Sequence, residues 1–180
     1  MRKYILLSGV VLCFSFLAEA GKVTVKALPA KSAAVDGSIC DGVAGNLVMN
    51  CGFETGDFTS WAQSGDLGFT TVDPGAANSG AYGGAFGPIG DQGYITQTLP
   101  TSAGQTYSLT YYISNTGSPN EFIVIWDGMI VSDDTDIPDI AYMSVTVDGL
   151  TASADGTDVT FGFRNDPSYI LFDDVSVVAN

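Results

Sequence analysis

The side chains best suited to holding a metal ion are carboxylates near opposite ends of the chain. Glu54 lies in the first third of the sequence, and Asp173 and Asp174 lie in the apolar run near its end. In an extended strand, Asp173 shares a face with the apolar side chains at 171, 175 and 177, and a buried carboxylate needs a partner. Because Ca²⁺ prefers hard oxygen ligands, we expect one structural calcium ion, held by these three acids and the backbone at Gly52. A hydrogen-bonded carboxylate or an outward-facing acid is the alternative.

A second set of residues has the chemistry of sugar recognition, in which aromatic rings stack on pyranose C–H faces and planar polar groups pair with hydroxyls. Arg164 is the only Lys or Arg from residue 46 to the end of the sequence. Its partner is either a glycan or a structural ion pair with Glu121 or Asp166. Trp126 shares a strand face with Phe122 and Val124, so a place in the core is its alternative role. The candidate sugar contacts are Tyr112, Asn120, Glu121, Trp126, Arg164 and Asn165.

The composition argues against two other classes of function. The chain has no histidine, which removes the usual catalytic triads and metal-hydrolase sites. No pair of carboxylates stands out as a glycosidase pair, so we expect no enzyme activity. A net charge of −14 repels phosphate backbones, and nucleic acid is therefore excluded as a partner.

The first residues have the pattern of an export signal. Arg2 and Lys3 precede an apolar run over 4–17, and the small residues around Ala20 suit cleavage after it. The apolar run is shorter than the roughly 20 residues that span a bilayer, and nothing later in the chain is long and apolar enough. We therefore expect a signal peptide over 1–20 and a mature protein that is secreted, extracellular or periplasmic, with no membrane span.

The cysteines fit that location. Cys13 falls within the expected signal peptide, which leaves Cys40 and Cys51 in the mature chain. An even pair of cysteines in an oxidising compartment predicts a disulfide.

The elements that must position these residues are short strands. Residues 21–45 are rich in Ala, Gly, Ser and Lys without a period, which is typical of a flexible arm or linker. From 46 to 180, short alternating runs are separated by Gly, Asn, Asp and Pro, which predicts one all-β domain, a two-sheet antiparallel sandwich. The clearest strands are 93–99, 106–114, 121–127, 142–147, 158–164 and 169–178, and weaker ones are 47–50, 68–72 and 81–86.

Several motifs in this range carry a resemblance to a known family. The opening segment NLVMNCGFETGDFTSW at 46–61 and the closing segment YILFDDVSV at 169–177 resemble the ends of galactose-binding-like jelly rolls. Between them SGAY, YITQTL and GQTYSL follow in the expected order, and PNEF and FGFRND resemble exported bacterial domains of the PEP-CTERM type. The resemblance implies a jelly roll, carbohydrate binding, and a structural calcium where the first and last strands meet.

Together these observations predict a secreted, non-catalytic module that binds a polysaccharide or a cell-surface or matrix glycan. The alternative is an extracellular structural or adhesion protein with the same sandwich and no sugar site. The sequence leaves the identity of the glycan and the oligomeric state open.

Overall fold

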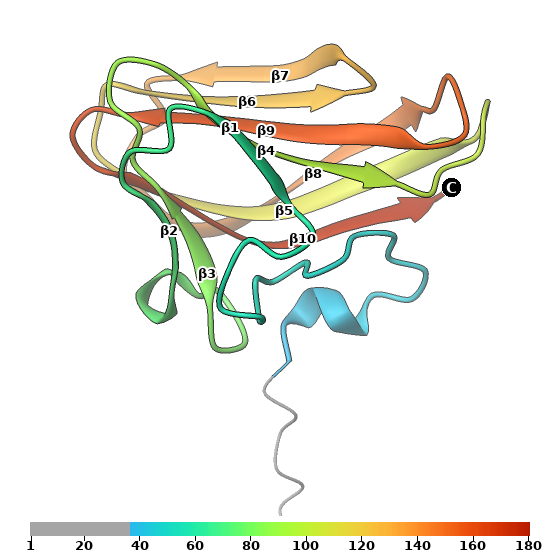
Figure 1. Ribbon diagram of the computed structural model, residues 1–180, viewed down its shortest axis with the longest axis horizontal. Coiled ribbons are helices and arrows are strands. Elements are labelled where there is room, and N and C mark those ends of the chain that lie inside the picture. Colours follow the sequence, from blue (N-terminus) through green and yellow to red (C-terminus); the bar gives the residue numbers. More distant parts are fainter. Residues whose placement is uncertain (1–36) are drawn as a thin grey trace, which may run out of the picture. The chain divides into compact units, whose positions relative to one another are not determined.

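Two antiparallel sheets pack face to face in the computed structural model, which describes residues 37–180 (Figure 1). The predicted signal peptide and residues 21–36 of the predicted arm lie outside the described residues. Sheet A has the strand order β1-β4-β9-β6-β7, and sheet B has the order β2-β3-β10-β5-β8. The strands are β1 Ala62–Gly65, β2 Thr70–Asp73, β3 Gly83–Phe86, β4 Gly93–Leu99, β5 Thr106–Thr116, β6 Asn120–Trp126, β7 Met129–Thr135, β8 Ile140–Thr151, β9 Thr157–Asn165 and β10 Tyr169–Ala179.

This arrangement confirms the predicted all-β sandwich and corrects several elements. Strands β4, β5, β6, β8, β9 and β10 fall where the alternating pattern placed them. Residues 47–50 do not form a strand, although the Leu47 N–H donates to the Val177 carbonyl oxygen at 2.9 Å. Two strands were not expected. The sequence of β1 has no β-branched residue, and β7 ends in acidic residues that are common in loops.

The core lies between the sheets and is rich in aromatic rings. Val159, Phe161 and Phe163 occupy alternate positions of β9 and are all 0% exposed, because alternate side chains of a strand lie on the same face. The ring of Phe86 stacks on that of Phe163 with 3.8 Å between centroids, and Phe172 of β10 packs against Phe161 at 4.7 Å. Strand parity therefore decides which side chains remain for the outer faces.

The N-terminal part of the described chain packs against both sheets. A short 3₁₀ helix, η1 Ile39–Gly42, is joined to the next segment by the predicted disulfide between Cys40 and Cys51, which is confirmed. The Cys51 carbonyl oxygen accepts from the Val175 N–H at 2.9 Å, and the Gln97 side chain holds the Met49 backbone at 2.8 and 2.9 Å. Residues 37–45, the end of the range expected to be an arm, thus belong to the folded unit.

Candidate functional sites on the two sheets

Strand β10 has a bulge at its acidic pair. Asp173 pairs with Tyr112 of β5, and after the irregularity pairing resumes at Ser176, so two residues of β10 oppose one of β5. Asp174 adopts a left-handed conformation with φ 54°, which Asp tolerates better than most residues. The bulge puts Asp173 on the outer face of sheet B and returns Val175 to the core. The prediction that Asp173 shares a face with 175 and 177 is therefore wrong.

Both carboxylates of this pair are buried and fully engaged. Asp173 is 0% exposed and accepts from the backbone N–H groups of Asn78 at 2.8 Å, Ser79 at 3.2 Å and Asp174 at 2.8 Å. The Asp174 carboxylate accepts from the Asn78 amide at 2.7 Å, the Ser79 hydroxyl at 2.7 Å and the Ser38 hydroxyl. The last strand therefore holds the segment at 78–79 tightly.

Glu54 holds the other end of the same loop. Its carboxylate accepts from the N–H groups of Ala81 at 2.9 Å and Tyr82 at 3.3 Å. Gly80 lies between these contacts with φ 67°, and a side chain there would collide with the Glu54 carboxylate. Acids from the opening segment and the closing strand thus converge on one loop, residues 78–82.

Gly52 forms part of the wall around the aspartate pair. A Cβ at this position would overlap the Ser38 side chain and lie 3.5 Å from Oδ1 of Asp173. Only glycine leaves room for Ser38 to reach Asp174. Each of the four residues predicted for a metal site therefore lies against either the loop at 78–82 or Ser38.

The aspartate pair brings two buried carboxylates together without a Lys or Arg of the described residues beside them. Burial, and next the charge of Asp174, raise the pKa of Asp173 to about 7, although three backbone N–H groups act in the opposite direction. Burial, with the two aspartates adding to it, also raises the pKa of Tyr142. Arg164 is the only Lys or Arg within 37–180, and its guanidinium contacts Glu121 and Asp166 instead. Either a shared proton or a cation must offset these buried carboxylates.

The carboxylate and hydroxyl oxygens around this pair are ligands of the kind that Ca²⁺ prefers, whereas the backbone N–H groups that now bond to Asp173 cannot bind a cation. Within residues 37–180, however, only one group of three acids or thiols has its ligand atoms all within 4.8 Å of one another. That group is Cys40, Asp41 and Cys51, and its two sulfurs already form the disulfide. The three predicted acids do not meet that spacing. A calcium ion at this loop would therefore draw mainly on the aspartate pair.

A different arrangement lies on the outer face of sheet A. Arg164 of β9 pairs in register with Glu121 of β6, and its guanidinium lies 3.7 Å from Glu121 Oε2 and 3.7 Å from Asp166 Oδ2. Both distances are longer than a good hydrogen bond. The Arg164 side chain is 28% exposed, and its Nε atom is buried without a hydrogen-bond partner in the described part of the chain.

Two residues before Arg164, Gly162 has no side chain and leaves room on the sheet for the Tyr94 ring and the Gln92 amide. Gly162 of β9 pairs with Tyr94 on one side and Ile123 on the other. A Cβ on Gly162 would lie 2.8 Å from the Tyr94 ring and 3.1 Å from Gln92 Oε1. Both amide atoms of Gln92 are buried and have no hydrogen-bond partner among the described residues. We refer to Gln92, Tyr94, Glu121 and Arg164 as the sheet A site.

Sequence reasoning found half of this site. Arg164 and Glu121 were predicted as a pair on the polar face of their strands, and the register brings them together. Gln92 and Tyr94 were missed. Tyr94 was recognisable as an outward-facing ring in a predicted strand, whereas Gln92 precedes the strand, and its position depends on the fold of the preceding loop.

Three of the predicted sugar contacts lie inside the sandwich. Asn120 and Asn165 are 1% and 0% exposed, and they join Asn115 in a network in which Asn165 Nδ2 donates to Asn115 Oδ1 at 2.8 Å. The Asn120 amide donates to the Ile137 carbonyl oxygen at 2.8 Å. Trp126 is 3% exposed, as its core alternative implied. A ligand on the outer faces does not reach these side chains, because strand parity points them inward.

Tyr112, the remaining predicted contact, lies on the opposite layer. It belongs to β5 and faces outward from sheet B beside Asp173. The ligand set predicted as one site is thus divided between two sheets and the core.

Comparisons with known proteins are informative at the level of the fold. No family model and no curated protein matches the sequence. Among solved structures, the module TmCBM61, determined in complex with β-1,4-galactotriose, has a TM-score of 0.65 and 16% identity, covering 76% of this chain and 100% of its own. The K3 cleaved adhesin domain of Lys-gingipain from Porphyromonas gingivalis w83 has a TM-score of 0.55 and 18% identity, covering 73% of this chain and 99% of its own.

A third similar structure is part of a larger protein. The enzymatically active domain of tailspike protein 4 from bacteriophage CBA120 has a TM-score of 0.57 and 14% identity, covering 75% of this chain and 21% of its own. At these identities the likeness concerns architecture. The chain is a sandwich of two five-stranded antiparallel sheets, similar to the jelly rolls of carbohydrate-binding modules.

Two further observations concern the setting of the protein. The Cys40–Cys51 disulfide is typical of proteins that fold outside a reducing cytosol. Within residues 37–180, no helix has the length and apolar character needed to cross a bilayer.

Proposed function

We propose that this chain is an exported, non-catalytic carbohydrate-binding module, and that the sheet A site is its glycan-binding surface. The Tyr94 ring would stack on the C–H face of one sugar. The Arg164 guanidinium would donate to its hydroxyl groups and Glu121 would accept, and the Gln92 amide, which is buried beside Gly162, would turn outward to donate when the sugar binds. The fold similarity to TmCBM61, a module solved with a bound galactotriose, supports this class of ligand.

One observation carries the proposal. Among the described residues, the Gln92 amide and Arg164 Nε are buried polar groups without a hydrogen-bond partner, and the Gln92 amide lies beside Gly162 and the Tyr94 ring. Leaving such groups unpaired costs stability, typically about 1–3 kcal/mol each and more for charged groups. Sugar hydroxyls are matched partners, because each can both donate and accept.

The charge of the protein restricts the ligand to neutral glycans. The chain has a net charge of −14, and the single cation of the sheet A site already lies beside two carboxylates. Sulfated or uronic acid polymers would be repelled. A neutral hexose polymer, such as a β-1,4-linked galactan, is therefore the first probe to use.

Substitutions at the site test the proposal directly. Arg164→Ala and Gln92→Ala should each weaken retention on a neutral glycan array by about tenfold or more, because each removes a hydrogen bond made in a dry site. Gln63→Ala serves as the control, since Gln63 is exposed on β1 of the same sheet. The thermal melting of all three variants should stay close to that of the parent.

The outcome also distinguishes a binding site from a scaffold. Unchanged glycan binding in both variants, or an equal loss of binding and melting temperature, would assign Arg164 and Gln92 to the fold. A colorimetric glycosidase assay on the bound glycans should show no product release, in line with the chain's lack of histidine.

We also propose that a calcium ion neutralises Asp173 and Asp174, with Glu54 and Gly52 completing the loop around it. Bound there, the ion would supply positive charge and fix the loop at 78–82 to the last strand. The support is the pair of adjacent buried carboxylates, next to which no Lys or Arg of the described chain lies.

An extracellular adhesion or matrix role is the second candidate, and the similarity to a gingipain adhesin domain favours it. A glycan array probed with and without calcium separates the two. Calcium-dependent self-association without binding to any glycan would support the adhesion role.

A further inference from the structure

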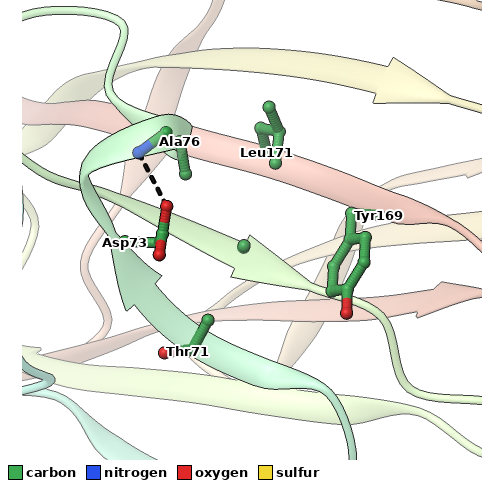
Figure 2. A pocket seen from close by; sticks show the side chains of 7 residues that line it. Thr71, Asp73, Ala76, Tyr169 and Leu171 are labelled. Atoms are coloured by element: carbon green, nitrogen blue, oxygen red, sulfur yellow. Dashed lines mark hydrogen bonds between the residues drawn. The ribbon is translucent and has the colours of Figure 1, made fainter.

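The outer face of sheet B has a depression that the sheet A site does not explain. Its volume is about 300 Å³, and Figure 2 shows Thr71, Asp73, Ala76, Tyr169 and Leu171 around it. These residues come from β2, β10 and the short 3₁₀ helix η2, Pro74–Ala76. None of them belongs to the sheet A site, which lies on the other sheet.

The depression forms because the middle strand carries small residues. Ala85 of β3 pairs with Thr71 of β2 on one side and with Leu171 of β10 on the other. The ring of Tyr169 lies against Gly87, where a Cβ would be 3.1 Å from ring atoms. The side chains of the flanking strands therefore form walls, and the Tyr169 ring remains 39% exposed.

The walls are held in place by hydrogen bonds. Oδ1 of Asp73 accepts from the Gly75 N–H at 2.7 Å, which fixes η2 at one end of the depression. The Tyr142 hydroxyl reaches across from β8 and donates to the Ala76 carbonyl oxygen at 2.5 Å. Oδ2 of Asp73 accepts no hydrogen bond from the described residues. The bond to Oδ1 thus fixes the Asp73 carboxylate in position, and Oδ2 is available to a ligand.

We propose that this depression is a second glycan site, which binds one pyranose unit of a neutral glycan. Tyr169 supplies the stacking ring, Ala85 supplies the apolar floor, Leu171 supplies an apolar wall, and Asp73 and Thr71 accept from hydroxyl groups. The volume is at the lower end of the range for small-molecule pockets, which suits a single sugar unit. The Asp73 carboxylate and the net charge of −14 disfavour anionic sugars.

Two sites on opposite sheets would have a consequence for assembly. Because the outer faces of sheets A and B point away from each other, one molecule would hold two glycan chains at once. On a polymeric ligand this arrangement cross-links chains and raises avidity. The second site shares its ligand class with the proposed function but none of its residues, so each can fail separately.

The test uses the mature chain and an array of neutral and acidic oligosaccharides. The double variant Gln92→Ala with Arg164→Ala should keep residual binding to neutral glycans, and adding Tyr169→Ala should lower that residual binding by about tenfold or more. Tyr169→Phe should retain it, because the ring is kept. Ser144→Ala is the control, since Ser144 is exposed on the same face of β8.

Each result decides between the sites. If Tyr169→Ala leaves binding unchanged both alone and in the double variant, the second site is refuted while the sheet A site stands. If only Tyr169→Ala has an effect, the sheet B site stands and the sheet A site is refuted. No binding of the parent protein to any glycan overturns both. Melting curves for every variant exclude loss of folding as the cause.

Discussion

The buried carboxylate of Asp173 makes a measurable prediction about stability in the absence of metal. Its pKa is raised to about 7 in the folded protein, mainly by burial, from an ordinary value of 3.8. The folded state therefore keeps a proton on Asp173 between about pH 4 and 7, where the unfolded chain has lost it. Because the folded state binds more protons in this window, the free energy of unfolding must fall as the pH rises.

The magnitude follows from the two pKa values. At about 1.4 kcal/mol per pKa unit, the full difference corresponds to about 4 kcal/mol between pH below 4 and pH above 7. Over the practical interval from pH 5 to 8, the expected loss is about 3 kcal/mol. Against a typical domain stability of about 5–15 kcal/mol, this change is well within reach of urea unfolding.

The assay compares Asp173→Asn with the parent protein in urea and EDTA at pH 5, 6, 7 and 8. The useful quantity is the free energy of unfolding of the parent minus that of the variant at each pH, because carboxylates distant from Asp173 contribute equally to both and cancel. The stability of the parent relative to Asp173→Asn should fall as the pH rises. Asp91→Asn, which removes one exposed negative charge, is the matched control measured over the same pH range.

In Asp173→Asn, the amide NH₂ group faces backbone N–H groups of Asn78, Ser79 or Asp174, which are also donors. The variant is therefore expected to be less stable than the parent at acidic pH. Only the slope with pH is diagnostic. A difference that is constant from pH 5 to 8 would refute the argument, because it would mean that Asp173 ionises in the folded protein as it does in the unfolded chain.

Three further predictions follow from the same structure. Millimolar calcium should raise the melting temperature at pH 8 and remove the fall in stability with pH, and Asp173→Asn should abolish this response in differential scanning fluorimetry. Cys51→Ser should lower the free energy of unfolding by about 3 kcal/mol in the entropy model of loop closure, and prior reduction of the parent should give the same value in a urea titration. Phe163→Ala should cost about 3–5 kcal/mol, since this ring is 0% exposed and stacks on Phe86, whereas Tyr112→Ala on the outer face of sheet B should cost much less by the same measurement.

The sequence predicted the fold well because strand alternation is a local property. The inward set Val159, Phe161 and Phe163 and the outward Arg164 are correct for that reason. Alternation fails at Asp174, where one residue in the left-handed conformation shifts the pattern and moves Asp173 to the other face. Asp is among the residues that adopt this conformation, but nothing in the local sequence required it here.

The sites were harder to predict because they depend on which strands are neighbours. Tyr112 and Arg164 both face outward, yet they belong to different sheets. Asn120 and Asn165 look like typical sugar contacts, but the Asn120 amide donates to a backbone carbonyl oxygen between the sheets and the Asn165 amide donates to the Asn115 side chain. Gln92 was missed because its isolation from hydrogen-bond partners is visible only once loops distant in sequence are packed together.

Strand β10 lies between β3 and β5, in the middle of sheet B, and it also bonds to the segment around Cys51. A ribosome delivers this strand after every other strand of the sandwich. Until it emerges, β3 and β5 have no common partner, and the aromatic cluster lacks Phe172. The domain therefore cannot fold progressively as it is synthesised, and closure must wait for long-range pairing, which is intrinsically slow.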